Sequence, residues 1–389
     1  MPFYNDFRSA SDHAQGDYPP IDPGMTPAEK LRTIDGLIRL RGQLDTLPQR
    51  KSEANLMMAS WNLVSFGAGD YRTTEAMFYI AEMLSRFDLI ALQEVKPSLR
   101  DLDRLMRMLG PNWAYQVNDA TGGDDGNDER SAYIFNTHRV TPNGVAGEVS
   151  AWDALRDQIG VARTELKRPA YMTGFRTAWK EFALINLHLH PGEKDAEGTR
   201  PADRDVRQQE VRLLLATLAA RMDALWTQNL VLVGDMNFYA SEDQATIDLI
   251  HAAGFWESAG LVGQTTNITV NPNGGEAYDR MFFNGDTYFR IAQDANGMEQ
   301  GGVLRLFDAV YRDQDWPSYR QLMSEKHGTP ASGQRLLTDD AAAWRYYRDT
   351  FRKRQLSDHH LIWVELAIDD ANAFLAERRV QVAAEAPIS

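Results

Sequence analysis

Short apolar segments with the character of β-strands recur from residue 56 to residue 366, and helical segments separate several of them. This alternation limits the possible folds more than any other feature of the sequence. The expected strands cover residues 56–62, 87–95, 132–135, 181–190, 229–235, 278–283 and 361–366. The expected helices cover residues 74–86, 99–109 and 203–225. Because several neighbouring strands also resemble short antiparallel pairs, the pattern predicts an α/β fold, specifically a two-sheet α/β sandwich with helices outside.

The rest of the sequence divides into flanking parts and one insertion. Residues 1–55 form an N-terminal extension, in which the sequence TPAE at 26–29 is typical of a helix start. We expect this amphipathic helix to pack on the core rather than lie on a membrane, because it has few bulky aromatic residues. The main domain is expected at 56–368, with a long insertion at 286–356 that carries its own helices, and residues 369–389 form a C-terminal tail.

Composition and charge exclude several classes of protein. The sequence has no cysteine, which excludes disulfides, thiolate metal sites and a cysteine nucleophile. It has no run of about 18 apolar residues, so no transmembrane segment is expected, and its first residues lack the pattern of a secretory signal. These features favour a cytoplasmic protein, and they leave its oligomeric state open. The net charge of −14 argues against a protein that coats DNA, but not against an enzyme with a local basic groove. Divalent cations held by carboxylates would also offset repulsion from a phosphate substrate.

Polar side chains recur at the ends of the apolar strands. They are Asn62, Glu94, His188, Asp235 with Asn237, Asp279, and Asp358 with His359. An acid or amide that ends a single strand is more often a turn residue than a catalyst. Strand ends at one edge of a sandwich converge, however, and crowded carboxylates repel one another unless a cation or a shared proton compensates. Because Glu94, Asp358 and Asn62 offer oxygen ligands, we expect them to hold Mg²⁺, for which Mn²⁺ can substitute.

Six short motifs, in this order, resemble the endonuclease/exonuclease/phosphatase superfamily. They are Trp61-Asn62, Leu92-Gln93-Glu94-Val95, Leu187-His188-Leu189, Gly234-Asp235-Met236-Asn237, Tyr278-Asp279-Arg280 and Ser357-Asp358-His359. The segments most similar to its deoxyribonuclease I branch are Gln93-Glu94-Val95-Lys96, Glu129-Arg130, Lys167-Arg168-Pro169-Ala170 and Tyr278-Asp279-Arg280. The resemblance implies the two-sheet sandwich of the deoxyribonuclease I-like type. The sequence departs from that branch in its N-terminal extension, its lack of cysteine and its longer connection between Asp279 and Asp358.

The resemblance also implies a role for each side chain. The expected catalytic residues are His188, His359, Asp235, Asp279 and Glu129, with Glu129 orienting His188 and Asp279 orienting His359. The expected substrate contacts are Asn237, Arg168, Lys96 and His190. The expected metal ligands are Glu94, Asp358 and Asn62.

Two further expectations follow from the residues themselves. His190 lies two positions after His188, so we expect it on the same strand face, where a contact with substrate phosphate or the rim of the site is favoured over a role as a second metal ligand. A basic run just before Ser357 is expected to steer a polyanionic substrate. The residues of this basic run are Arg345, Arg348, Arg352, Lys353 and Arg354.

Together these features predict a Mg²⁺-dependent phosphodiesterase, most simply an endonuclease that hydrolyses DNA phosphodiester bonds. Two histidine–carboxylate pairs supply two proton transfers near neutral pH, while Asp235 positions or deprotonates the attacking water. An inositol-polyphosphate or lipid phosphatase or phosphodiesterase on the same fold is the alternative. The sequence after Asn237 lacks the arginine that such inositol phosphatases tend to carry. A non-enzymatic binding module is disfavoured, because all the acids and histidines are present.

Overall fold

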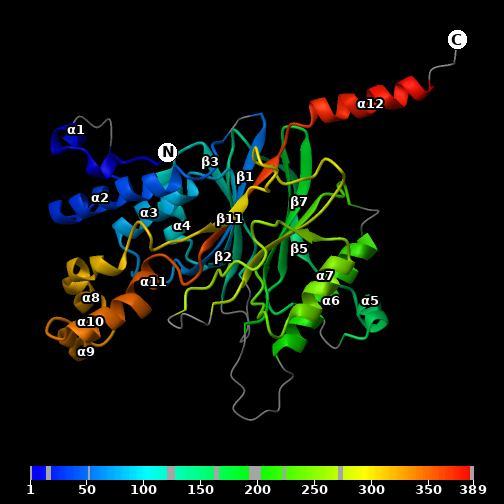
Figure 1. Ribbon diagram of the computed structural model, residues 1–389. Coiled ribbons are helices and arrows are strands. Elements are labelled where there is room, and N and C mark those ends of the chain that lie inside the picture. The colour runs from blue at the N-terminus through cyan, green and yellow to red at the C-terminus, as the bar shows by residue number, and fades with distance from the viewer. Residues whose placement is uncertain are drawn as a thin grey trace.

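Two six-stranded sheets pack face to face, and helices cover their outer surfaces (Figure 1). This computed structural model describes residues 2–14, 19–50, 53–120, 128–161, 166–191, 203–221, 225–269 and 275–385. The architecture is the two-sheet α/β sandwich that the sequence predicts. No helix among these residues is long and apolar enough to cross a membrane.

The first sheet has the strand order β11-β12-β1-β2-β4-β3. Its strands are β1 (Asn55–Phe66), β2 (Leu89–Val95), β3 (Trp113–Val117), β4 (Arg130–Asn136), β11 (Gly301–Leu304) and β12 (Leu361–Ala367). The second sheet has the order β5-β6-β7-β8-β10-β9. Its strands are β5 (Thr141–Val149), β6 (Ala170–Thr177), β7 (Lys180–His188), β8 (Leu230–Asp235), β9 (Trp256–Glu257) and β10 (Asp279–Asn284). Strands β1 and β2 run parallel, as do β7 and β8, so each pair ends at a shared edge.

The helices lie before, between and after these strands in the chain. They are α1 (Ala10–Ala14), α2 (Pro27–Leu44), α3 (Thr74–Leu84), α4 (Arg100–Leu109), α5 (Asp153–Ile159), α6 (Asp203–Arg221), α7 (Gln244–Ala252), α8 (Arg320–Lys326), α9 (Pro330–Leu336), α10 (Asp340–Tyr346), α11 (Arg352–Gln355) and α12 (Ala371–Glu385). Short helical turns are η1 (Asn5–Phe7), η3 (Asp313–Tyr319) and η4 (Tyr347–Phe351). The strands and helices named in the sequence analysis are all present, within a few residues of their expected ends.

The side chains of β1 alternate between two cores, as the pleat of a strand requires. Leu56 and Met58 pack between the two sheets. Met57, Ala59 and Trp61 point to the other side, into the core beneath α2, α3 and α4. A third core lies between the second sheet and α6 with α7. The order of layers is therefore helices, sheet, sheet, helices.

The N-terminal helix and the insertion pack against the same face of the first sheet. The capping residues expected for α2 are present, since Thr26 and Glu29 each accept the other's backbone N–H. On α3 the carboxylate of Glu75, 2% exposed, pairs with Arg32 of α2 at 2.6 Å. It also accepts the hydroxyl of Tyr319, from the insertion, at 2.6 Å. A buried carboxylate requires such partners, and here they join α2, α3 and the insertion.

The C-terminal tail forms a helix that projects from the sandwich (Figure 1). None of its residues from Ala371 to Glu385 is buried. Its base is fixed by Asp370, which pairs with Lys180 and with Arg290. The last four residues of the predicted tail, 386–389, lie outside the described residues.

Candidate active site

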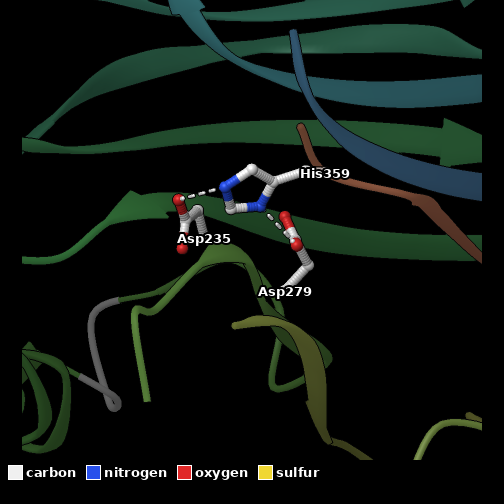
Figure 2. A group of neighbouring side chains, drawn as sticks. All are labelled: Asp235, Asp279 and His359. Atoms are coloured by element: carbon white, nitrogen blue, oxygen red, sulfur yellow. Dashed lines mark hydrogen bonds and ion pairs between the residues drawn. The ribbon is translucent and has the colours of Figure 1, made fainter. Parts of the chain in front are cut away.

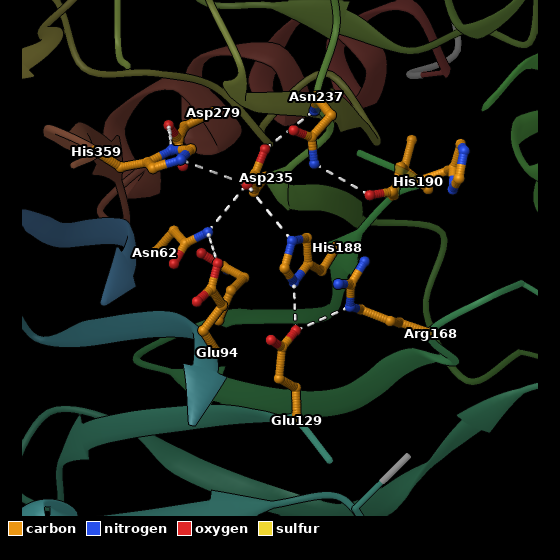
Figure 3. Close-up of polar contacts among 12 residues, drawn as sticks. Asn62, Glu94, Glu129, Arg168, His188, His190, Asp235, Asn237, Asp279 and His359 are labelled. Atoms are coloured by element: carbon orange, nitrogen blue, oxygen red, sulfur yellow. Dashed lines mark hydrogen bonds and ion pairs between the residues drawn. The ribbon is translucent and has the colours of Figure 1, made fainter. Parts of the chain in front are cut away.

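The polar residues that end the strands converge at one edge of the sandwich (Figure 3). In the second sheet, His188 on β7 and Asp279 on β10 are both register partners of Asp235 on β8. From the first sheet, Asn62 on β1 donates its Nδ2 N–H to Asp235 Oδ2 across 3.0 Å. The two sheets therefore meet at this edge through a direct hydrogen bond.

Asp235 is the centre of the cluster. Its side chain is buried, and Oδ1 accepts the backbone N–H of Asn237 at 3.0 Å. Oδ2 lies 3.6 Å from Nε2 of His188 and 3.7 Å from Nε2 of His359. Burial alone would raise the pKa of Asp235, but His359, His188 and the two hydrogen-bond donors outweigh it and hold the pKa below its ordinary value. Asp235 is therefore an ionised carboxylate between two imidazoles near neutral pH.

His359 and Asp279 form a tight buried pair (Figure 2). His359 Nδ1 lies 2.7 Å from Asp279 Oδ2, and the imidazole Nε2 faces Asp235. Burial would lower the pKa of His359, but the carboxylates of Asp279 and Asp235 outweigh it and raise the pKa well above its ordinary value. The protonated form of His359 is therefore favoured near neutral pH.

His188 has its own carboxylate, Glu129, just before β4. His188 Nδ1 lies 3.4 Å from Glu129 Oε2. Arg168 donates its Nε N–H to the same oxygen at 2.9 Å, and Lys96 Nζ lies 3.3 Å from Oε1. Burial would raise the pKa of Glu129, but His188, Arg168 and Lys96 outweigh it and lower the pKa to about 2. Glu129 is thus held ionised against the imidazole.

These contacts change the interpretation of two residues expected to touch substrate. Arg168 is 7% exposed, and with Lys96 it pairs with Glu129 rather than lying open to solvent. Arg168 is therefore a buried partner of Glu129 rather than a solvent-exposed surface charge. Arg168 pairs with Glu129 because the segment before β6 lies beside the start of β4 in the folded chain. The linear sequence does not reveal this contact.

The turn after β8 depends on Gly234. Its φ is +133°, and a Cβ there would lie 2.1 Å from the carbonyl oxygen of Leu187, so no other residue fits. Three residues on, Asn237 also has positive φ, at 52°. Asn237 Nδ2 donates to Leu189 O at 3.1 Å, which fixes the amide and uses one of its two N–H groups.

The three expected metal ligands come from three strand ends of the first sheet. Glu94 Oε1 accepts from Asn62 Nδ2 at 3.0 Å, and Oε2 accepts from the backbone N–H of Ser65 at 2.8 Å. Asn62 Oδ1 is buried and has no hydrogen-bond partner among the described residues. Asp358 is half-buried directly before His359. An unpartnered amide oxygen next to the Glu94 carboxylate fits a hard divalent cation such as Mg²⁺ or Mn²⁺.

Asp235, Asp279 and His359 form a second group that could bind a metal ion (Figure 2). One potential ligand atom from each residue lies within 4.8 Å of the other two. Its histidine is already bound to Asp279, so protonation of the ring competes with any metal there. That this group transfers protons while the Glu94 group holds the cation remains a prediction.

His190 does not share the orientation of His188. Strand β7 ends at His188, so the alternation that would put both rings on one face stops there. His190 Nε2 lies 3.0 Å from Asp203 Oδ1 of α6, and its backbone N–H donates to Glu210. Burial lowers the pKa of His190. The structure thus places this ring against α6, outside the group centred on Asp235.

The basic run before Ser357 is largely engaged within the protein. Arg352 is buried, pairs with Asp313 at 2.6 Å and lies over the ring of Phe307. Arg348 pairs with its neighbour Asp349. Lys353 donates to the carbonyl of Ile268 at 2.5 Å. Arg354 lies over the ring of Tyr71. That this basic run steers a substrate therefore stays a prediction.

Two amides for which the sequence predicts no role join the sheets behind the site. Gln93 Nε2 donates to Asn186 Oδ1 at 2.7 Å. Asn186 Nδ2 donates to the carbonyls of Leu92 and Ala132, at 3.0 and 3.2 Å. The available signal was an asparagine inside the apolar strand β7, two positions before His188 and therefore on the same face.

Comparisons with known proteins point to one family. The model of the endonuclease/exonuclease/phosphatase family matches residues 59–301. Deoxyribonuclease-1 of Homo sapiens is 29% identical over 154 residues, which cover 37% of this chain and 51% of that protein. Deoxyribonuclease gamma of Mus musculus is 26% identical over 244 residues, which cover 58% of this chain and 70% of that protein. The chain spans about half the length of the deoxyribonuclease-1 sequences that it matches.

Solved structures are also similar. An endonuclease/exonuclease/phosphatase family protein from Bacteroides thetaiotaomicron is 18% identical, with a TM-score of 0.48 over 81% of this chain and 98% of that one. The family match covers more than half of the sequence, from β1 to β11. The chain therefore belongs to the endonuclease/exonuclease/phosphatase family.

Proposed function

We propose that this chain is a divalent-metal-dependent phosphodiesterase that acts on DNA as an endonuclease. The observation that carries the proposal is the position of Asp235 Oδ2, which lies within 3.7 Å of the Nε2 atoms of both His188 and His359. Each imidazole has its own carboxylate on Nδ1, Glu129 or Asp279. A phosphodiester that enters here meets a titratable group on each side, which is what general acid–base hydrolysis needs.

The ionisation states of His359 and Asp235 support a separate role for each in proton transfer. His359 is protonated because Asp279 and Asp235 raise its pKa, so it donates a proton to the leaving oxygen. Asp235 is ionised, so it orients the attacking water and accepts its proton. Glu129 fixes the ring of His188, whose Nε2 faces the phosphate from the other side. Asn237 retains one amide N–H for a phosphoryl oxygen.

A divalent cation held by Glu94, Asn62 and Asp358 would supply Lewis-acid stabilisation of the phosphoryl charge. The net charge of the chain is −14, so a cation at this position also offsets the repulsion between protein and polyanion. The curated relatives named above are deoxyribonucleases, which supports DNA as the polymer.

The test is incubation of the purified chain with supercoiled plasmid in Mg²⁺, Mn²⁺ or EDTA, with gel analysis of nicked and linear products. We expect nicking that requires the metal. The Asp235→Asn variant, nearly identical in shape, controls for contaminating nucleases and is expected to be inactive. Parallel reactions contain RNA, a soluble inositol polyphosphate, and vesicles with phosphoinositide or sphingomyelin. Intact DNA together with phosphate release from the inositol compounds would replace the nuclease proposal by the phosphatase alternative.

A further inference from the structure

Two strained residues face each other behind the proposed cation. Ser65 on β1 has a φ of 48° and Glu94 on β2 has a φ of 60°, both in the left-handed region that favours glycine. The register between β1 and β2 shifts between Asn62 and Phe66, so this part of β1 lacks regular pairing. The backbone N–H of Ser65 nevertheless reaches Glu94 Oε2 at 2.8 Å. Such conformations cost free energy and persist only where surrounding contacts enforce them.

Those contacts come from Arg72, in the segment that leads into α3. Its side chain is buried, and Nη2 donates to the carbonyls of Val64 at 2.7 Å and Leu356 at 3.2 Å. Nη1 lies 3.4 Å from the carbonyl of Ser65. One guanidinium thus ties the strained end of β1 to the chain two residues before Asp358. The planar guanidinium holds these three carbonyls from two nitrogens at a fixed spacing, which the single ammonium nitrogen of a lysine does not reproduce.

The charge of Arg72 is not matched by an equally close carboxylate. Among the described residues its ion-pair partner is Asp101, 4.0 Å away, and Arg72 Nε has no hydrogen-bond partner. Burial lowers the pKa of Arg72 to about 10, against the opposing effect of Asp101, Glu94 and Asp358. It stays protonated near neutral pH. A buried charge without a close counter-ion is costly, so stability alone does not account for an arginine here.

We infer that Arg72 is a positioning residue for the metal site: by holding Val64, Ser65 and Leu356 together, it sets the spacing at which Glu94 and Asp358 bind one cation. The inference rests on the proposed metal site. It assigns Arg72 no contact with substrate or with the reacting atoms, and its effect reaches the cation only through the two carboxylates.

The test measures Mn²⁺ binding to the full chain directly, by the loss of the electron paramagnetic resonance signal of free Mn²⁺. Arg72→Lys keeps the positive charge but loses the planar guanidinium group. We expect this variant to weaken Mn²⁺ affinity by about 10- to 100-fold. Saturating Mg²⁺ should restore much of its activity, with little change in the KM for DNA. In the Arg72→Lys background, Ser65→Gly should recover part of the affinity, because glycine adopts this φ without strain. The double variant also serves if Arg72→Lys alone folds poorly.

The matched control is Arg139→Lys at the opposite end of β1. Arg139 is also a partly buried arginine that binds a strand carbonyl, at Asn55, and it pairs with Asp88. We expect this variant to be less stable to heat but to bind Mn²⁺ within about twofold of the wild type. Unchanged affinity in Arg72→Lys, or an equal loss in Arg139→Lys, would overturn the positioning role. If the wild-type chain binds no Mn²⁺, or Glu94→Gln binds it normally, the proposed metal site itself is wrong.

Discussion

His359 Nδ1 lies 2.7 Å from Asp279 Oδ2, and both side chains are buried. The carboxylate fixes the tautomer and the rotation of the ring, so that Nε2 is aimed at Asp235. Because Asp279 comes from β10 and His359 from the segment before β12, this contact links the two sheets at the site. It also explains why a buried histidine carries a proton near neutral pH.

Asp279→Asn is expected to lower kcat/KM by at least about 10²-fold, because an amide cannot stabilise the imidazolium as a carboxylate does. Removing the carboxylate also lowers the pKa of His359 toward its ordinary value, so the alkaline limb of the pH–rate profile should move to lower pH. Kinetics from pH 5 to 9 and titration of the ring by NMR check both effects. Asp248→Asn, on the exposed face of α7, is the control. An alkaline limb at the wild-type position would contradict the assignment of His359 as the acid.

His188→Ala and His359→Ala are each expected to lower kcat by about 100-fold or more, because one general acid or base usually contributes that much. Because both rings face Asp235 and act in one step, the double variant should lose less than the product of the single losses. Single-turnover kinetics on a plasmid at saturating metal measure all three. Strictly multiplicative losses would show that the two histidines act independently.

Glu129→Gln is expected to reduce stability in a pH-dependent way. The pKa of Glu129 is lowered to about 2 in the folded chain from an ordinary 4.5, so its ionised form stabilises the fold. This contribution, on the order of 3 kcal/mol, is fully present above the ordinary pKa and is lost as the pH falls toward the folded value. Urea unfolding of both proteins between pH 7 and pH 3 measures the difference, which should shrink below about pH 4.5. A difference that is constant with pH would mean that Glu129 acts only through packing.

Glu94→Ala is expected to remove most of the activity and to weaken Mn²⁺ binding, because an oxygen ligand and a negative charge are lost together. His359→Ala should lose comparable activity but keep its metal affinity, which separates the two parts of the site. Isothermal calorimetry with Mn²⁺ distinguishes them. Normal Mn²⁺ binding by Glu94→Ala would move the cation to another set of ligands.

Local sequence patterns were enough to predict the sandwich and most of its central strands. The apolar runs of β2 and β8 are buried on both faces, so they are continuous and easily recognised. Strands β3, β5, β6, β9 and β11 were not predicted. Strand β5 is mostly exposed and contains proline and two glycines, and β3, β9 and β11 are short edge strands. Strand β6 lies inside its sheet, but threonines, a glycine and an arginine interrupt its apolar residues. Edge strands bury little apolar surface, so their sequences carry little hydrophobic pattern.

The sequence by itself determined which chemical groups end the strands, because hydrophobic periodicity locates a strand end and the residue there is read directly. Only the tertiary structure decided what each group touches. It placed Arg168 and Lys96 on Glu129, turned His190 toward Asp203, and engaged Arg352 with Asp313. These partners are 13 to 39 residues apart in the chain. A buried charged side chain pairs with an opposite charge that lies near it in the folded chain. Which charge lies near it depends on how the helices and strands pack together, and no local sequence pattern contains that information.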